Sequence, residues 1–117
     1  MQYLLLIYDN EKMWAGMPKD QSDTMFREYM EFTADIKKSG HFIAGDALQP
    51  IATATTVRVR EGKTQTTDGP FAETKEQLGG YYLIQAKDLD EATKIAARIP
   101  SSRVGSIEVR PIATYGK

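Results

Sequence analysis

The stretch QYLLLIY, residues 2–8, decides the fold. It is bounded by a polar, glycine-containing segment, which is typical of a β-strand. Its apolar residues do not alternate with polar ones, so both faces of the strand must be covered. GYYLIQA, residues 80–86, has the same character. A sheet that contains both strands therefore needs a layer on each side.

A long amphipathic segment predicts a helix for one of those layers. Between residues 22 and 39, side chains recur every three or four positions on one helical face, namely Met25, Phe26, Tyr29, Met30, Thr33 and Ile36. Ser22 or Asp23 is suited to cap the start of this helix, and Gly40 to follow its end.

A second helix is expected after Asp88, with Glu91 at the capping-box position and Pro100 as its stop. Its apolar face consists of Ala92, Ile95, Ala96 and Ile99. Both predicted helices are amphipathic, so each has one face to bury.

The remaining strands complete the topology. Strands are expected at 41–48 and 105–112, and a hairpin at 57–67 that turns at Glu61-Gly62-Lys63. The order β-α-β, hairpin, β-α-β predicts an α+β, ferredoxin-like (split βαβ) antiparallel sheet with two helices on one face. The length of 117 residues favours a single domain, residues 1–117.

Two helices cover only one face of this sheet. The simplest cover for the other face is the sheet of a second copy, so the sequence predicts a homodimer through sheet faces. The alternative is a monomer whose long loops fold over the sheet.

The composition limits the classes of function. Fifteen basic and sixteen acidic residues leave a net charge of −1, which argues against a nucleic-acid partner. The chain has no cysteine and one histidine, and it lacks the glycine-rich phosphate-binding motifs, so neither a metal site nor a cofactor is expected. Its longest apolar run, residues 3–8, is too short to cross a membrane and has no basic lead-in, which predicts a cytoplasmic protein without a membrane partner.

DGPFAETKEQLGGYY, residues 68–82, is the most distinctive motif. Pro70 must end the preceding strand, and Asp68 fits either a turn-forming role or a carboxylate that acts on a ligand. Residues 70–78 fit a short helix or an ordered loop. Gly79-Gly80 lets the chain re-enter the sheet, or lets a backbone or ligand approach closely.

These residues identify a family resemblance. TDGPFAETKEQLGGYYLI, residues 67–84, together with YLLLIY at the start and SIEVRPI at the end, closely resembles the YCII-related proteins of the DGPF type. The resemblance implies a ferredoxin-like fold that assembles as a dimeric α+β barrel. Members of this type are mostly uncharacterised bacterial proteins, many encoded beside extracytoplasmic-function sigma factors, so the resemblance also implies an association with such a pathway.

The wider superfamily includes enzymes acting on small ring compounds, such as a dehydrochlorinase, and members with a proposed His–Asp pair. In those members the histidine lies in the first helix, whereas here Tyr29 occupies roughly that place. The only histidine, His41, follows the helix and would need Asp46 or Asp68 as its carboxylate partner to act as a base.

Three functions are therefore expected. The first is a binding or regulatory module that holds a small polar or aromatic ligand between sheet and helices, with Tyr29, Asp46, Phe71 and Tyr82 as ligand-binding residues. The second is a cofactor-independent enzyme (isomerase, lyase or hydrolase, resembling a dehydrochlorinase) with Asp68 or His41 in proton transfer. The third is a structural motif whose protein acts through partner contacts. The segment around Trp14 is expected to pack against a partner or to cover a pocket.

Overall fold

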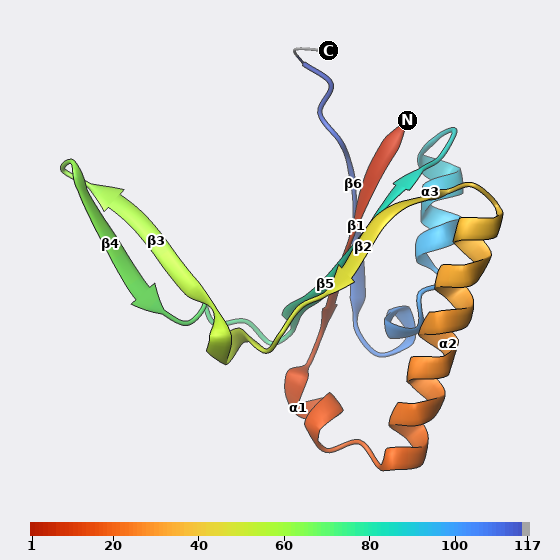
Figure 1. Ribbon diagram of the computed structural model, residues 1–117, viewed down its shortest axis with the longest axis horizontal. Helices are drawn as coiled ribbons and strands as arrows, with labels where there is room; N and C mark the ends of the chain where they lie inside the picture. The colour runs from red at the N-terminus through yellow and green to blue at the C-terminus, as the bar shows by residue number, and fades with distance from the viewer. Residues whose placement is uncertain (116–117) are drawn as a thin grey trace.

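The computed structural model describes residues 1–115 (Figure 1). Its elements, in chain order, are β1 Gln2–Asp9, α1 Glu11–Ala15, α2 Lys19–Lys38, β2 Phe42–Ala47, η1 Ile51–Thr53, β3 Thr55–Arg60, β4 Lys63–Asp68, β5 Gln77–Gln85, α3 Leu89–Ala96, η2 Pro100–Arg103 and β6 Ser106–Pro111.

Four strands form one antiparallel sheet in the order β2-β5-β1-β6. This order interleaves the two βαβ halves, since β5 lies between β2 and β1 and β1 lies between β5 and β6, and α2 and α3 both lie on one side of the sheet (Figure 1). The predicted ferredoxin-like fold is therefore confirmed. None of the described helices is long and apolar enough to span a membrane.

The core lies between this sheet and the two helices. Every second residue of β1 from Tyr3 points to the helices and is buried, as the two-residue period of a strand requires. The cluster is Tyr3, Leu5, Ile7, Phe32, Ile36, Tyr82, Ile84, Ala86, Ala92, Ile95, Ala96 and Ile99. Of the predicted apolar face, Ala92, Ile95 and Ala96 lie on α3 and are buried, and Ile99 is buried after it. The helix ends at Ala96, and Pro100, its predicted stop, begins η2 instead.

Helix α2 differs from its prediction in two ways. It begins at Lys19 after Pro18, one turn before the predicted caps Ser22 and Asp23, and the early ion pair between Lys19 and Asp23 suits a helical first turn. Its buried residues are Met25, Phe32 and Ile36, whereas Phe26 and Met30 are exposed. The predicted single apolar face is therefore two neighbouring stripes, of which only one faces the core.

Helix α3 is capped as predicted. The Asp88 side chain accepts a hydrogen bond from the Glu91 backbone N–H. The Glu91 carboxylate reaches the N–H of Lys87 and not that of the cap residue, one position further back than in a capping box.

Strands β3 and β4 form a separate two-stranded hairpin, which we call the arm (residues 55–68). Glu61 and Gly62 both have positive φ, as a two-residue turn of this kind requires. The arm extends away from the sheet on the side opposite to α2 (Figure 1). After it, residues 70–76 form a loop, which resolves the choice between helix and loop left open by the sequence.

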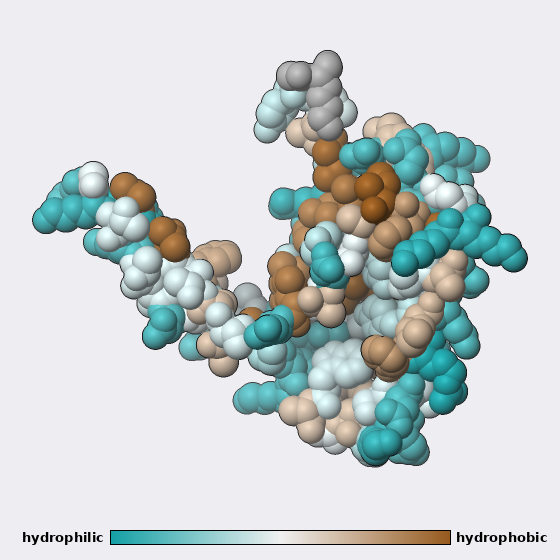
Figure 2. All heavy atoms as spheres, in the orientation of Figure 1, coloured by the Kyte–Doolittle hydropathy of each residue, from teal (hydrophilic) through white to brown (hydrophobic). Residues whose placement is uncertain are grey.

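The second face of the sheet carries Leu4, Leu6 and Leu83, which are partly exposed. The arm projects past this face without folding over it (Figure 1). Figure 2 shows apolar residues gathered on the side of the body that is turned toward the arm.

Candidate functional site

A cleft of about 1160 Å³ lies between α2 and the sheet. Its floor includes Gly45, Gly79 and Gly80, from β2 and β5. A Cβ atom at Gly80 would lie 3.0 Å from the Asp46 carbonyl oxygen, and one at Gly79 would lie 3.5 Å from Asp9 Oδ1. The absence of side chains here keeps two strands close together and leaves the floor of the cleft open.

The mouth of the cleft is lined by apolar side chains. Phe26 and Met30 on α2 are 67% and 59% exposed, and Leu48, after β2, is 46% exposed. Trp14, from α1, completes this apolar lining. Large apolar side chains left open to water around a cavity are typical of a binding site.

A chain of hydrogen bonds lies at the inner end of the cleft. The Tyr29 hydroxyl donates to Ser101 Oγ over 2.5 Å, and Ser101 Oγ donates to Asp9 Oδ2 over 2.8 Å. Asp9 is only 5% exposed and Ser101 is fully buried. We call this the Tyr29–Ser101–Asp9 chain. Both hydroxyl hydrogens point toward the carboxylate, so Tyr29 has lone pairs free to accept a further bond.

Tyr82 is held in the same cleft by Thr33. Thr33 Oγ1 uses its one hydrogen on the Tyr29 carbonyl oxygen, 2.9 Å away, so the Tyr82 hydroxyl must be the donor in their 2.6 Å contact. Burial raises the pKa of Tyr82, and it raises the pKa of Tyr29 to about 12. Both phenols are therefore neutral at physiological pH.

Asp46 is among the residues that line the cleft, but it pairs with Tyr81 on the face of the sheet away from α2, where it accepts a hydrogen bond from the Tyr81 hydroxyl over 2.8 Å. This bond raises the pKa of Tyr81. The acceptors at the inner end of the cleft are therefore Asp9 and the oxygen of Tyr29.

The structure divides the predicted site residues into two groups. Tyr29, Asp46 and Tyr82 line the cleft, as expected of a ligand site between sheet and helix. His41, Asp68 and Phe71 are not among the residues that line it.

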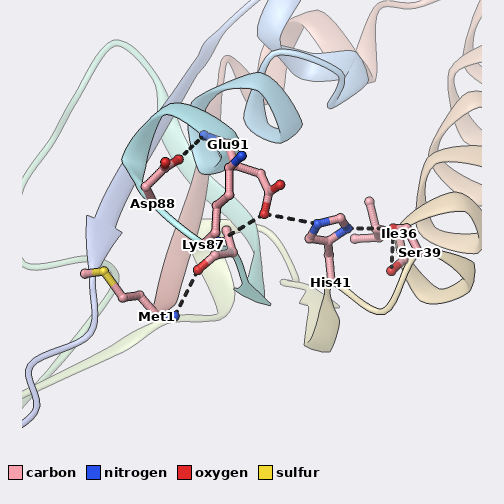
Figure 3. A network of polar contacts seen from close by, with 8 residues as sticks. Met1, Ile36, Ser39, His41, Lys87, Asp88 and Glu91 are labelled. Carbon is pink, nitrogen blue, oxygen red and sulfur yellow. Dashed lines mark hydrogen bonds and ion pairs between the residues drawn. The ribbon is translucent and has the colours of Figure 1, made fainter.

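His41 lies after the C-terminal end of α2, where Figure 3 shows it between Ser39 and Glu91. Its Nδ1 is 2.6 Å from Ser39 Oγ, and its Nε2 is 3.3 Å from Glu91 Oε1. The carboxylate that contacts His41 is therefore Glu91, and the expected pairing with Asp46 or Asp68 is wrong. Asp46 is instead turned to Tyr81, so neither expected carboxylate shares the histidine's surroundings.

Asp68 ends the arm, where it pairs with Thr55 across the hairpin. Within residues 1–115, no hydrogen bond of its side chain is found, and the bend after it is held by the Gly69 N–H on the Ala54 carbonyl. Phe71 lies in the following loop and is 79% exposed. Across the described residues, no three metal-ligating side chains converge.

Sequence reasoning missed Asp9 and Ser101. A signal for Asp9 was present, since it continues the alternation of Tyr3, Leu5 and Ile7 and must therefore face the helices. No comparable signal marks Ser101, because only the folded chain brings η2 against the end of β1.

Comparisons with known proteins agree with this architecture. The family model described as the YCII-related domain matches residues 1–115. An uncharacterised protein of Rhizobium meliloti (strain 1021) is 37% identical over 117 residues, covering 98% of this chain and 94% of that protein. Among solved structures, the chain is similar to 5-chloro-2-hydroxyhydroquinone dehydrochlorinase from Burkholderia phenoliruptrix AC1100 in complex with 2,5-dihydroxybenzoquinone. The TM-score is 0.57 and the identity 12%, with 97% of this chain and 94% of that chain covered.

Proposed function

The chain belongs to the YCII-related family, and on that premise we propose that its cleft binds a small, flat, hydroxylated ring molecule. The observation that carries this proposal is the Tyr29–Ser101–Asp9 chain at the inner end of a mainly apolar cleft. An apolar cavity with a few convergent polar groups is the usual form of a small-molecule site.

The directions of these hydrogen bonds indicate which kind of ligand group the cleft can bind. The hydrogens of Tyr29 and Tyr82 are committed to Ser101 and Thr33. At its inner end the cleft offers acceptors, so a ligand group that donates, such as the hydroxyl of a phenol or hydroquinone, is favoured there over one that only accepts. The donors Lys37 and Trp14 line other parts of the cleft. The aromatic rings of Trp14 and Phe26 favour a planar ring between them and the glycine floor.

The same arrangement supports a second function, a cofactor-independent lyase or isomerase. Asp9 is the carboxylate placed to accept a proton from a bound hydroxyl, directly or through Tyr29 and Ser101. Tyr29, with a pKa of about 12, would pass a proton along and would not hold a negative charge at neutral pH. The structural similarity to a dehydrochlorinase supports this alternative only through the shared fold. Proton transfer by His41 or Asp68 is disfavoured, because neither side chain lines the cleft.

Three expectations from the sequence stay predictions. They are the assignment to the DGPF type, the link to an extracytoplasmic-function sigma factor, and a cytoplasmic location. We also propose the homodimer, with the sheets packed through the face that carries Leu4, Leu6 and Leu83, because partly exposed leucines at the middle of a sheet favour a second layer.

The chain's single tryptophan, Trp14, lines the cleft and gives a direct test. We expect hydroquinones to change Trp14 fluorescence on titration. Tyr29→Phe, which removes the accepting oxygen, should weaken binding by about tenfold, as loss of one hydrogen bond implies. Asp68→Asn serves as the control outside the cleft and should bind like wild type.

The outcomes separate the alternatives. Binding that Tyr29→Phe weakens and Asp68→Asn does not would support the proposed site. Turnover of the bound compound that is lost in Asp9→Asn would select the enzyme over the binding module. Equal binding by wild type and Tyr29→Phe, or no hydroquinone binding at all, would refute the proposal.

A further inference from the structure

The arm has no packing partner within the described part of its own chain. A two-stranded hairpin is only marginally stable in water by itself. The Cα radius of gyration is 16.3 Å, whereas a compact chain of this length has about 13 Å. The chain alone is therefore more extended than a compact domain of its length.

One face of the arm is apolar. Val57 and Val59 are 60% and 58% exposed and alternate with Arg58 and Arg60, so the two valines share one face of β3. Figure 2 shows the apolar residues of the arm along its edge turned toward the body, across the open space beside the sheet. The face that carries Val57 and Val59 is therefore suited to pack against an apolar surface of another molecule.

The cleft presents a matching apolar surface at its mouth, formed by Phe26 and Met30 of α2. The arm cannot cover the mouth of the cleft in its own chain, because the arm and α2 lie on opposite sides of the sheet (Figure 1). An arm that covers this mouth must therefore come from another copy.

The dimensions agree with that arrangement. In a face-to-face dimer, the partner's sheet lies about 10 Å from the first sheet, and its helices add a layer of about 10 Å. Six-residue strands span about 20 Å, so an arm of the length of β3 and β4 crosses both layers. Two-fold symmetry makes the exchange reciprocal.

We infer that the arm of one copy packs on α2 of a second copy, with Val57 and Val59 over Phe26 and Met30, and closes that copy's cleft. Each ligand site is then completed by the partner subunit. This inference rests on the dimer and the cleft of the proposed function, and it adds a role for the arm that neither requires.

Directed cross-linking tests this placement, because the chain contains no cysteine of its own. A tagged chain with Val57→Cys is co-expressed with an untagged chain with Met30→Cys, and the mixture is oxidised. We expect a tagged–untagged disulfide dimer on a non-reducing gel, which mass spectrometry assigns to positions 57 and 30. Leu89→Cys replaces Met30→Cys as the control, since Leu89 is similarly exposed (54%) but lies on α3.

A second measurement needs no cysteine. Amide hydrogen exchange of residues 55–68 should be on the order of tenfold slower in the wild-type dimer than in a Leu6→Glu monomer. Equal exchange in the two proteins would overturn the inference. So would a wild-type monomer, or a dimer in which Val57→Cys links no better to position 30 than to position 89.

The Trp14 titration tests the ligand site, and the cross-linking experiment tests the placement of the arm, so the two proposals can fail independently. A disulfide between positions 57 and 30 without hydroquinone binding would leave the arm in place and refute the ligand. Hydroquinone binding without that disulfide would support the ligand site and refute the placement of the arm.

Discussion

At the scale of the residue, the candidate site depends on Asp9 and Ser101, whereas His41 lies outside it. A buried carboxylate costs several kcal/mol unless donors satisfy it, and Ser101 supplies one such donor while accepting from Tyr29. Within residues 1–115 no fully buried side-chain polar atom lacks a partner. The serine thus connects a neutral phenol in the cleft to the carboxylate on β1.

Ser101→Ala breaks this connection and leaves both neighbours without their bond. We expect it to lower the free energy of unfolding by about 1–3 kcal/mol, measured by urea denaturation. Ser102→Ala is the matched control, because its hydroxyl bonds the Ala97 carbonyl in an exposed position, and it should cost under about 1 kcal/mol. Equal costs for the two serines would contradict this account of the Tyr29–Ser101–Asp9 chain.

At the scale of the element, the junction between η2 and β6 positions Ser101. The Gly105 N–H bonds the Ser101 carbonyl oxygen over 2.7 Å, and Ser106 then pairs with Tyr8 of β1. A Cβ at Gly105 would lie 2.1 Å from the Tyr8 carbonyl oxygen and 2.9 Å from Asp9 Cβ. Only glycine lets β6 begin this close to the end of β1.

Gly105→Ala must therefore move backbone against backbone. We expect it to destabilise the protein by about 2 kcal/mol or more, because neither strand can yield without losing pairing. Gly16→Ala is the control, since its nearest neighbour would lie 3.4 Å away and its φ is −91°, and thermal denaturation should find it within about 0.5 kcal/mol of wild type. A neutral Gly105→Ala would mean that the strand ends are not as close as described.

At the scale of the whole molecule, the sheet has one covered face and one that is partly exposed. Leu6 lies on the exposed face and pairs with Tyr81 and Glu108 in the neighbouring strands. In a face-to-face dimer this position is buried, and a charge there would be removed from water.

Leu6→Glu should weaken the dimer by at least about 2 kcal/mol, roughly thirtyfold in its dissociation constant. Light scattering or sedimentation at several concentrations measures this. Leu89→Glu, on the outer surface of α3, is the control and should remain dimeric. A wild-type protein that stays monomeric at high concentration would refute the dimer.

Much of the fold followed from local pattern. The two-faced strands, the α3 cap and the turn at Glu61-Gly62 depend on neighbours within a few residues, so the sequence was enough to predict them. The start of α2 was predicted one turn late because strong capping residues, Ser22 and Asp23, lie inside the helix. Its two apolar stripes read as one face, because the spacing of three and four is the same for side chains facing a core and side chains facing a cleft.

The candidate site was predicted only in part. Tyr29 and Tyr82 line the cleft because they face inward from elements whose period was clear, whereas Asp46 lies beside Tyr81 on the other face of the sheet. Asp68 and Phe71 drew attention as part of a distinctive motif, but only the end of that motif, residues 79–82, lines the cleft, and its first residues lie at the base of the arm. His41 drew attention as the only histidine, but it contacts Ser39 and Glu91 beyond the C-terminal end of α2.

By itself, the sequence determined the family resemblance, the ferredoxin-like topology and the need for a layer on each side of the sheet, since periodicity and apolar content are local properties of the chain. Only the tertiary structure decided that Asp9, Ser101 and Tyr29 meet and that the arm leaves the body on the side away from the cleft. The physical reason is that hydrogen bonds between side chains 72 and 92 positions apart depend on how strands and helices are packed, which no local pattern encodes.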